Sequence, residues 1–274
     1  MWDERSVSAS QASSTSQYPR RVLACPNCSL ALDISEVGAT CSNQHSFDRG
    51  RGGYLNLLVG GRLSSAAVAG DTADSLAARR RFLTAGNYQP IADALTDAVA
   101  DCPGPVLDVG CGEGWYLSQL ENDRYGLDVS KAAVQMAARA HRDVMFVVGS
   151  AYRLPVLDGS VGVAVSVFAP HPFDEFARVL RPGGWWVTVT PGPLHLREMK
   201  PDLSDRERVN ERMQRRSEPL PEARSATRVQ YALQLTEESA ADLYAMTPLR
   251  FQRDAGPKGL TEVTVDVWVS SSRA

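Results

Sequence analysis

Several features are scarce in this sequence of 274 residues, and each scarcity excludes a class of protein. No apolar run approaches the roughly 20 residues that a membrane helix needs, and residues 1–20 hold no apolar signal-peptide core. The five cysteines, an odd number in a long chain, argue against a disulfide framework. The net charge of -3 restricts any nucleic-acid binding to local basic patches. We therefore expect a cytoplasmic protein without a membrane segment.

Composition divides the chain into regions of different character. Residues 1–20 are rich in serine and poor in large aliphatic side chains, which predicts a disordered tail. Residues 21–58 are rich in turns and contain potential metal ligands, which predicts a small metal-stapled module. Residues 59–87 join a Gly/Ser/Ala-containing stretch to a basic stretch at 79–81 and are predicted to form a linker and a basic helix. Residues 88–274 are predicted to form the main domain.

In this main domain, apolar runs alternate with helical patterns, which is typical of an α/β fold with helices covering a largely parallel, doubly wound sheet. Seven strands are predicted, at 106–109, 125–128, 144–148, 161–168, 185–190, 228–235 and 262–270. The first five are continuous apolar runs and should be buried on both faces. The last two alternate apolar and polar residues and therefore suit a sheet edge.

The N-terminal module has the ligand spacing of a zinc site. Two tight turns, each offering a pair of soft or borderline ligands, can deliver four ligands to one tetrahedral ion. Because four protein ligands leave no open position, the spacing predicts a structural zinc and not a catalytic one. The alternative is that these residues are unrelated. The predicted ligands, in the pattern C-x2-C-x12-C-x3-H, are Cys25, Cys28, Cys41 and His45. The other cysteines, Cys102 and Cys111, are expected to be small packing residues.

A glycine-rich turn follows the first predicted strand of the main domain. It lacks the third glycine of the dinucleotide fingerprint, because Trp115 stands there, and it lacks the Gly-Lys-Ser/Thr of a P-loop. It has instead the form D-x-G-x-G-x-G that is associated with S-adenosylmethionine binding. Glycines allow the backbone to approach a ligand closely at a helix N-terminus. The residues of this turn expected to bind the cofactor are Asp108, Gly110, Gly112, Glu113 and Gly114.

Asp128 ends the second predicted strand and can accept both hydroxyls of a ribose, as the comparable acidic residue does in dinucleotide-binding folds. The alternative is that the glycines serve helix–strand packing and that Asp128 only caps a helix beginning at Ser130. The turn, the acid and the strand pattern agree with one another, which favours the cofactor site. The fold predicted is that of a class I S-adenosylmethionine-dependent methyltransferase with a seven-stranded sheet and a small N-terminal zinc-binding module.

With both motif sets combined, the chain resembles the 23S rRNA guanine-N1 methyltransferases, the family that includes the tylosin-resistance methyltransferases. The resemblance covers about residues 25–270. A zinc module joined to this methyltransferase core is specific to the family, whereas the glycine motif alone is shared by a very large superfamily. Beyond the zinc ligands, the resemblance rests on the motifs at 45–48, 53–58, 70–71, 78–83, 85–90, 106–116, 126–131, 168–170 and 190–196.

The resemblance implies methyl transfer from S-adenosylmethionine to N1 of a guanosine in a 23S rRNA hairpin loop near the peptide exit tunnel, with macrolide (tylosin-type) resistance. It further implies a homodimer and a zinc module that helps to form the RNA-binding cleft. Tyr88, Gly112, Glu113 and His195 would contact the cofactor. Because N1 lies on the Watson–Crick edge, the target must be unpaired or flipped out of its stack. No catalytic base is identified, since the motif D/N-P-P-Y/F is absent.

Arginines are the candidate RNA contacts, and those beside the zinc module, Arg49 and Arg51, are favoured. Other candidates lie at 20–21, 79–81 and 206–216, although acidic residues interrupt the last group and favour a solvated helix. Two other functions remain open. A small-molecule methyltransferase would turn over without RNA. A non-catalytic zinc RNA-binding protein would have a decayed cofactor fold, against which the intact glycines and Asp128 argue.

Overall fold

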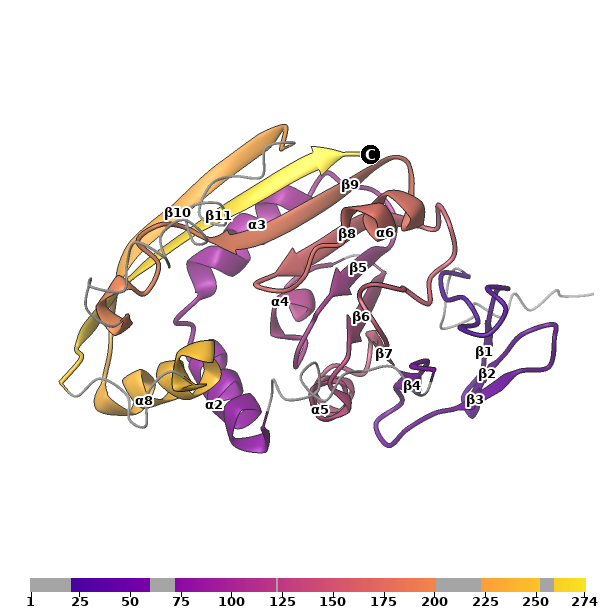
Figure 1. Ribbon diagram of the computed structural model, residues 1–274, viewed down its shortest axis with the longest axis horizontal. Coiled ribbons are helices and arrows are strands. Elements are labelled where there is room, and N and C mark those ends of the chain that lie inside the picture. Colours follow the sequence, from indigo (N-terminus) through magenta and orange to yellow (C-terminus); the bar gives the residue numbers. More distant parts are fainter. Residues whose placement is uncertain (1–20, 60–71, 122, 201–222, 252–258) are drawn as a thin grey trace, which may run out of the picture.

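The computed structural model describes residues 21–59, 72–121, 123–200, 223–251 and 259–274. The predicted tail at 1–20, part of the predicted linker and the arginines at 206–216 lie outside the described residues. Two sheets are present in the described part, one of three strands and one of eight. They lie side by side in Figure 1, with the small sheet at one end of the molecule.

The small sheet belongs to the N-terminal module. It consists of β1 (Asp33–Ile34), β2 (Gly38–Thr40) and β3 (Ser46–Asp48), paired antiparallel in that order. The next strand, β4 (Leu55–Asn56), leaves this sheet and pairs in parallel with β7 (Met145–Val148) at one edge of the large sheet. The module therefore contributes a strand to the main domain.

The large sheet has the strand order β10-β11-β9-β8-β5-β6-β7-β4. All seven predicted strands are present, and the module's β4 adds an eighth. Pairing is parallel from β4 to β9, whereas β11 runs antiparallel to both β9 and β10. The remaining strands are β5 (Val106–Val109), β6 (Arg124–Asp128), β8 (Val161–Val167), β9 (Leu180–Pro191), β10 (Ser225–Gln234) and β11 (Glu262–Arg273).

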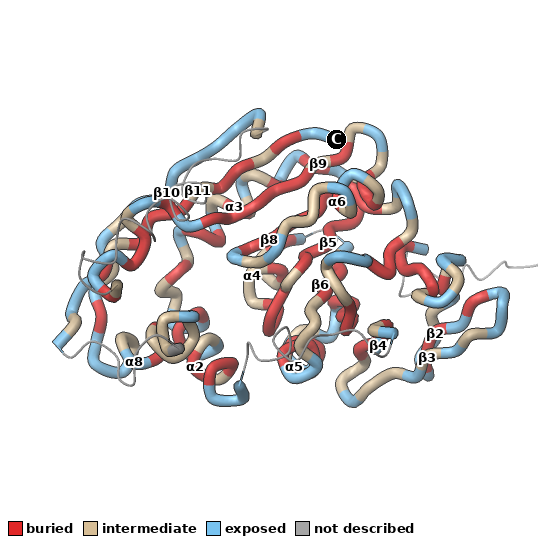
Figure 2. The backbone as a smooth tube through the Cα atoms, viewed as in Figure 1, coloured by how far each residue is buried: buried red, intermediate tan, exposed pale blue. Residues whose placement is uncertain are grey.

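Helices cover both faces of the large sheet, which encloses two apolar cores. The first core joins one face of the sheet to α3 and α5, and the second joins the other face to α6 and to buried residues of the N-terminal module such as Leu23 and Leu32. Figure 2 shows the central strands of the sheet, such as β5 and β8, as largely buried, whereas the edge strand β10 is largely exposed. The helices are α2 (Ala73–Thr84), α3 (Gln89–Val99), α4 (Trp115–Ser118), α5 (Lys131–Ala140), α6 (Phe173–Val179) and α8 (Glu237–Met246).

Two short 3-10 helices, η1 (Arg197–Met199) and η3 (Pro248–Phe251), complete the described elements. The predicted basic helix is present as α2, and it packs against α8. The helix predicted to begin at Ser130 is α5, and the Ser130 side chain caps it by accepting a hydrogen bond from the Ala133 N–H. In the part of the chain that the structure describes, no helix is long and apolar enough to cross a membrane.

The last two strands differ from the edge pair expected from their alternating pattern. β10 is an edge strand, but β11 lies inside the sheet between β9 and β10. Its apolar residues Val263, Val265 and Val267 belong to the first core. Its alternating polar residues do not all face solvent, because Asp266 is fully buried and paired with Arg228 of β10. At Asp266, therefore, the alternation marks a buried carboxylate and not an exposed side chain.

Candidate functional site

The predicted zinc ligands converge on one point of the N-terminal module. The ligand atoms of Cys25, Cys28, Cys41 and His45 all lie within 4.8 Å of one another. The Cys28 and Cys41 sulfurs are 3.7 Å apart, and His45 Nδ1 lies 3.4 Å from the Cys41 sulfur and 3.5 Å from that of Cys25. A tetrahedral zinc ion with normal bond lengths would set these separations at about 3.8 Å and about 3.6 Å. The donor set therefore fits a structural zinc.

Two similar turns bring the ligands together. In the first, the Ser29 N–H bonds to the Cys25 carbonyl at 2.7 Å, and in the second the Gln44 N–H bonds to the Cys41 carbonyl at 2.8 Å. Ser29 and Gln44 both have a positive φ, of 59° and 61°. Each turn folds the chain back sharply enough to present a pair of ligands. The local sequence thus builds the metal site, as the paired spacing predicted.

Two sets of backbone hydrogen bonds fasten this module to the large sheet. The Ala24 N–H donates to the Pro155 carbonyl and the Leu157 N–H to the Val22 carbonyl, both at 2.9 Å. On the other side, the Leu57 N–H donates to the Val148 carbonyl at 2.9 Å, next to the pairing of β4 with β7. Module and sheet are therefore built as one unit.

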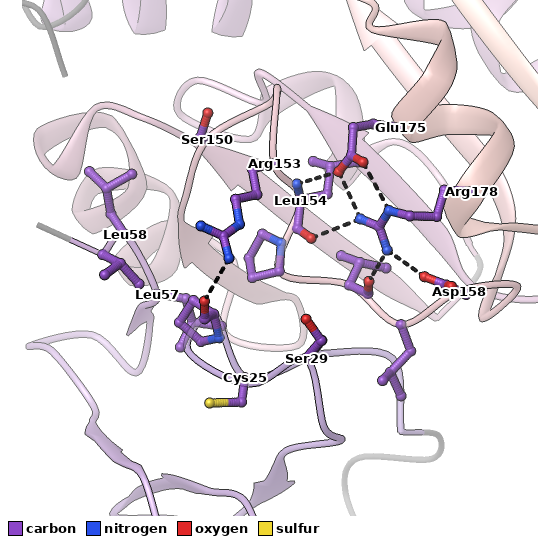
Figure 3. A pocket seen from close by; sticks show the side chains of 16 residues that line it. Cys25, Ser29, Leu57, Leu58, Ser150, Arg153, Leu154, Asp158, Glu175 and Arg178 are labelled. Atoms are coloured by element: carbon purple, nitrogen blue, oxygen red, sulfur yellow. Dashed lines mark hydrogen bonds and ion pairs between the residues drawn. The ribbon is translucent and has the colours of Figure 1, made fainter. Parts of the chain in front are cut away.

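A cavity of about 820 Å³ lies at this junction, lined by residues of the module and of the loop after β7 (Figure 3). Arg178 of α6 buttresses the loop: it bonds to the carbonyls of Leu154 and Val156, at 3.0 and 2.8 Å, and pairs with Glu175 and Asp158. None of the residues predicted to bind the cofactor lines this cavity. It is thus a feature of the module junction and not the cofactor site.

The glycine-rich turn lies between β5 and α4 and is tied to the end of β6. The Gly112 N–H donates to Asp128 Oδ2 at 2.9 Å, and the Ser130 N–H donates to Asp128 Oδ1 at 2.8 Å. Gly110 and Gly114 both have positive φ, and a Cβ at Gly110 would lie 2.4 Å from the Cβ of Ala169. The turn therefore requires glycine. Asp128 is not the cap of α5, which is Ser130; it holds the backbone of that cap residue and the glycine-rich turn in place.

Carboxylates are concentrated at this turn. Asp108 and Glu113 are 2% and 5% exposed, with Asp128 beside them. Burial, followed by the nearby charges of Asp128 and Glu113, raises the pKa of Asp108 to about 8. Asp108 Oδ1 is buried and has no hydrogen-bond partner among the described residues, and the same holds for the Tyr116 hydroxyl. Such atoms are costly to leave unpaired, so the Asp108 carboxyl group and the Tyr116 hydroxyl fit a polar ligand such as S-adenosylmethionine.

Tyr88 and His195 lie together at the carboxyl edge of the sheet. Their ring centroids are 6.3 Å apart, and both residues are buried. Burial, with the charge of Lys200, lowers the pKa of His195 to about 4, so its ring is neutral near pH 7. Its Nδ1 accepts a hydrogen bond from the Asp266 N–H at 3.2 Å, so the ring proton sits on Nε2.

The loop that carries His195 is anchored by a buried carboxylate, that of Asp266, which pairs with the more exposed Arg228. The Asp266 carboxylate accepts two hydrogen bonds from Arg228, at 2.8 and 3.0 Å, and one from the Leu194 N–H at 2.8 Å. Burial acts to raise the pKa of Asp266, but these hydrogen bonds outweigh it and hold the pKa below its usual value. Gly192 packs so closely that a Cβ there would lie 2.5 Å from the carboxylate. Asp266 thus holds the loop at residues 192–195 in place through these contacts.

Comparison with known proteins identifies both the N-terminal module and the domain that contains the glycine-rich turn. Residues 23–60 match a family model described as "RlmA, N-terminal", a zinc ribbon, and residues 107–188 match one described as "Methyltransferase domain". The 23S rRNA (guanine(748)-N(1))-methyltransferase of Streptomyces fradiae is 36% identical over 90% of this chain and 95% of its own. The chain belongs to the 23S rRNA (guanine-N1)-methyltransferase family.

The chain is also similar to two further proteins. A Micromonospora griseorubida protein, provisionally assigned as a 23S rRNA (guanine-N1)-methyltransferase, is 35% identical over 85% of this chain and 88% of its own. Among solved structures, a geranyl diphosphate C-methyltransferase from Streptomyces coelicolor is 17% identical, with a TM-score of 0.36, and covers 65% of this chain and 75% of that chain. The predicted family, methyltransferase fold and zinc-binding module are confirmed.

Some site residues of this methyltransferase were missed by sequence reasoning. Arg79 of α2 lies over the glycine-rich turn, where its Nη1 would be 3.3 Å from a Cβ at Gly112. Tyr116 and Asp266, both described above, have no sequence signal beyond their residue type, because they reach the site from α4 and from the far end of the chain. The pattern of arginines at 79–81 had suggested RNA contacts instead.

The arginines favoured for RNA binding differ in what they do. Arg49 donates to the Ser35 carbonyl at 2.8 Å and also to the Gly53 carbonyl, so it holds the module together. Arg51 is exposed. Arg81 makes a two-pronged pair with Asp242 of α8 and thereby links α8 to α2.

Proposed function

We propose that this protein transfers a methyl group from S-adenosylmethionine to N1 of a guanosine in 23S rRNA. Family membership carries the proposal, because the Streptomyces fradiae relative is named for this reaction at guanine 748. The proposed target lies in a hairpin loop near the peptide exit tunnel. The proposed consequences are tylosin-type macrolide resistance, a cytoplasmic location and assembly as a homodimer.

The residues proposed to hold the cofactor are Tyr88, Asp108, Gly110, Gly112, Glu113, Gly114, Asp128 and His195. When bound, S-adenosylmethionine supplies an electrophilic methyl group, and guanine N1 gains this methyl as it loses its proton. The acidic side chains of Glu113 and Asp128 favour the cationic cofactor, and the neutral imidazole of His195 adds no opposing charge. Asp108, with a pKa of about 8, is protonated near pH 7 and can donate a hydrogen bond. Asp128 holds the glycine-rich turn, and Asp266 holds the loop that carries His195.

RNA is proposed to bind on the side where the zinc module joins the sheet. Arg51 of the module is exposed, and exposed Arg153 lines the junction cavity, with its Nη2 3.4 Å from the Pro26 carbonyl. Arginine–phosphate contacts at this junction would fix the RNA while the target base leaves its stack. The zinc ion holds the module, and with it Arg51, in the conformation required.

The decisive experiment incubates the zinc-loaded protein with labelled S-adenosylmethionine and unmodified bacterial 23S rRNA, and maps the product by mass spectrometry. We expect N1-methylguanosine at a single hairpin-loop position, with guanine 748 or its equivalent as the first site to inspect. Label in RNA at a different base, or at a different atom of guanine, would contradict the proposal. Label in small molecules without RNA would favour a small-molecule methyltransferase.

A further inference from the structure

Phe168 occupies an unusual place for a large apolar side chain. It directly follows β8 and lies at the carboxyl edge of the sheet, where open α/β sheets bind their ligands. The preceding strand is buried throughout, yet Phe168 is 40% exposed. An exposed aromatic ring next to a binding edge is a candidate contact for a flat, partly apolar ligand.

The backbone of Phe168 is strained. Its φ is +53°, in the left-handed region that a bulky residue other than glycine rarely adopts. Hydrogen bonds maintain this conformation: the Phe168 N–H donates to the Val189 carbonyl at 3.0 Å, and the Ser166 hydroxyl reaches the carbonyls of Ala169 and Pro170, both at 3.1 Å. Residues held in such strain gather at functional sites, where the surrounding structure enforces a geometry that the chain alone would avoid.

The strained turn connects the two parts of the proposed cofactor site. Ala169, the next residue, packs directly on Gly110 of the glycine-rich turn. On its other side, the Phe168 ring stacks on His195, with centroids 5.6 Å apart and planes inclined by 21°, and it lies 6.2 Å from the ring of Tyr88. Since His195 covers one side of the ring, the exposed surface of Phe168 lies on the rest of it.

We propose that Phe168 is the platform on which the target guanine stacks after it has turned out of the RNA. This inference rests on the proposed function. Every base has an apolar π-face that can stack on an aromatic ring, and such stacking holds extruded bases in their pockets. A base stacked on Phe168 is placed beside the glycine-rich turn, as the methyl transfer requires. The backbone strain is then part of the site, because it presents the ring outward.

Steady-state kinetics on 23S rRNA test this role through the variants Phe168→Leu and Phe168→Tyr. Loss of base–aromatic stacking should lower kcat about 5- to 150-fold in Phe168→Leu, whereas Phe168→Tyr retains the ring and should stay within about threefold of the wild type. The KM for RNA should change little, since phosphate contacts dominate RNA affinity. Trp185→Leu, which removes an aromatic ring at the amino-terminal edge of the same sheet, is the matched control.

A third variant, Phe168→Asn, separates this role from a packing role. Asparagine tolerates positive φ, so Tm should equal or exceed that of the wild type while kcat falls as in Phe168→Leu. Cofactor affinity, measured by calorimetry, should be unchanged in all three variants. Wild-type kcat in Phe168→Leu, or loss of cofactor affinity in that variant, overturns the inference. A wild-type protein that forms no N1-methylguanosine overturns the proposed function and this inference together.

Discussion

The zinc site and the cofactor site are built in opposite ways. Neighbouring residues of two short turns form the zinc site, and its ligand atoms already lie at the separations that the ion requires. The cofactor site gathers residues from β5, β6, α2, α4 and the loop after β9, and it leaves the Asp108 Oδ1 and the Tyr116 hydroxyl buried without hydrogen-bond partners among the described residues. The zinc ion stabilises the fold of the first site. In the second site the unpaired atoms lower the stability of the free protein, and a bound cofactor that pairs with them would raise it.

The largest effect expected from this contrast follows loss of a zinc ligand. In Cys41→Ser, we expect zinc to fall from one equivalent per chain to near zero, and residues 21–58 to become sensitive to protease, because the module has little core apart from the ion and the sheet. Metal analysis and limited proteolysis provide the readouts. Cys102→Ser, at a buried cysteine outside the cluster, is the control and should keep its zinc. A full equivalent of zinc in Cys41→Ser would refute the assignment.

In the cofactor site, replacement of the ionisable Asp108 should raise the stability of the free protein, whereas loss of a zinc ligand should lower it. With a pKa of about 8 in the folded state, Asp108 binds a proton that the unfolded chain releases near pH 4, so stability should decline as pH rises from about 4 to about 8. Asp108→Asn removes this titration. We expect the variant to be more stable than the wild type at pH 8, by about 1–3 kcal/mol, because no unpaired charge is buried.

The same substitution should weaken S-adenosylmethionine binding about 10- to 150-fold above pH 8, where the wild-type Asp108 is ionised and offers a charged acceptor. Urea unfolding across the pH range and calorimetry provide the two measurements. Asp97→Asn, at an exposed position on α3, should change neither. Lower stability of Asp108→Asn at pH 8, or unchanged cofactor affinity, would show that the two sites do not differ in the way described.

A change in stability alone is expected at Asp266, where the polar groups beside the cofactor site are already hydrogen-bonded to one another. In Asp266→Asn, Arg228 and the Leu194 N–H share a neutral acceptor, and we expect a loss of about 1–3 kcal/mol in the free energy of unfolding. The pKa of Asp266 is lowered in the folded state, so this difference is present near pH 7 and should close as pH falls below the usual aspartate range. A double-mutant cycle with Arg228→Met isolates the pair. A coupling free energy near zero would contradict it.

The smallest effect concerns two arginines of the zinc module. Arg51→Gln should reduce the slope of log affinity for RNA against log salt by about one, without changing Tm, because Arg51 is exposed. Arg49→Gln should lower Tm instead, since Arg49 holds the carbonyls of Ser35 and Gly53. Filter binding at several salt concentrations and thermal unfolding separate the two. An unchanged salt slope in Arg51→Gln would remove this arginine from the RNA surface.

Short-range patterns accounted for much of the molecule. The spacing of Cys25, Cys28, Cys41 and His45 specified the metal site, because each pair of ligands sits within one turn. The apolar runs located the central strands, because a strand that is buried on both faces is apolar along its whole length. The glycines at 110, 112 and 114 marked the turn, since glycine adopts their positive φ values without strain.

Features that depend on distant pairing escaped the sequence. Leu55 and Asn56 are too few to show a strand period, so β4 could not be assigned to the large sheet. Asp266 resembles a solvent-facing residue of an alternating strand, but it is buried, and its partner Arg228 comes from β10, 38 residues away in sequence. Arg49 could not be distinguished from Arg51 without the carbonyls that it holds. The sequence shows whether a residue is charged and whether a strand alternates, but it does not show which partner the fold places beside that residue.

The pairing of β4 with β7 has a consequence for solubility. β4 is two residues long, so it closes the border of the large sheet with little exposed strand of its own. Without the module, the buried residues Met145–Val148 would present open backbone N–H and C=O groups and apolar side chains to other chains, which is the usual origin of edge-to-edge aggregation. Loss of zinc would then cause the protein to aggregate through this exposed edge. The ion therefore prevents self-association in addition to stabilising the module.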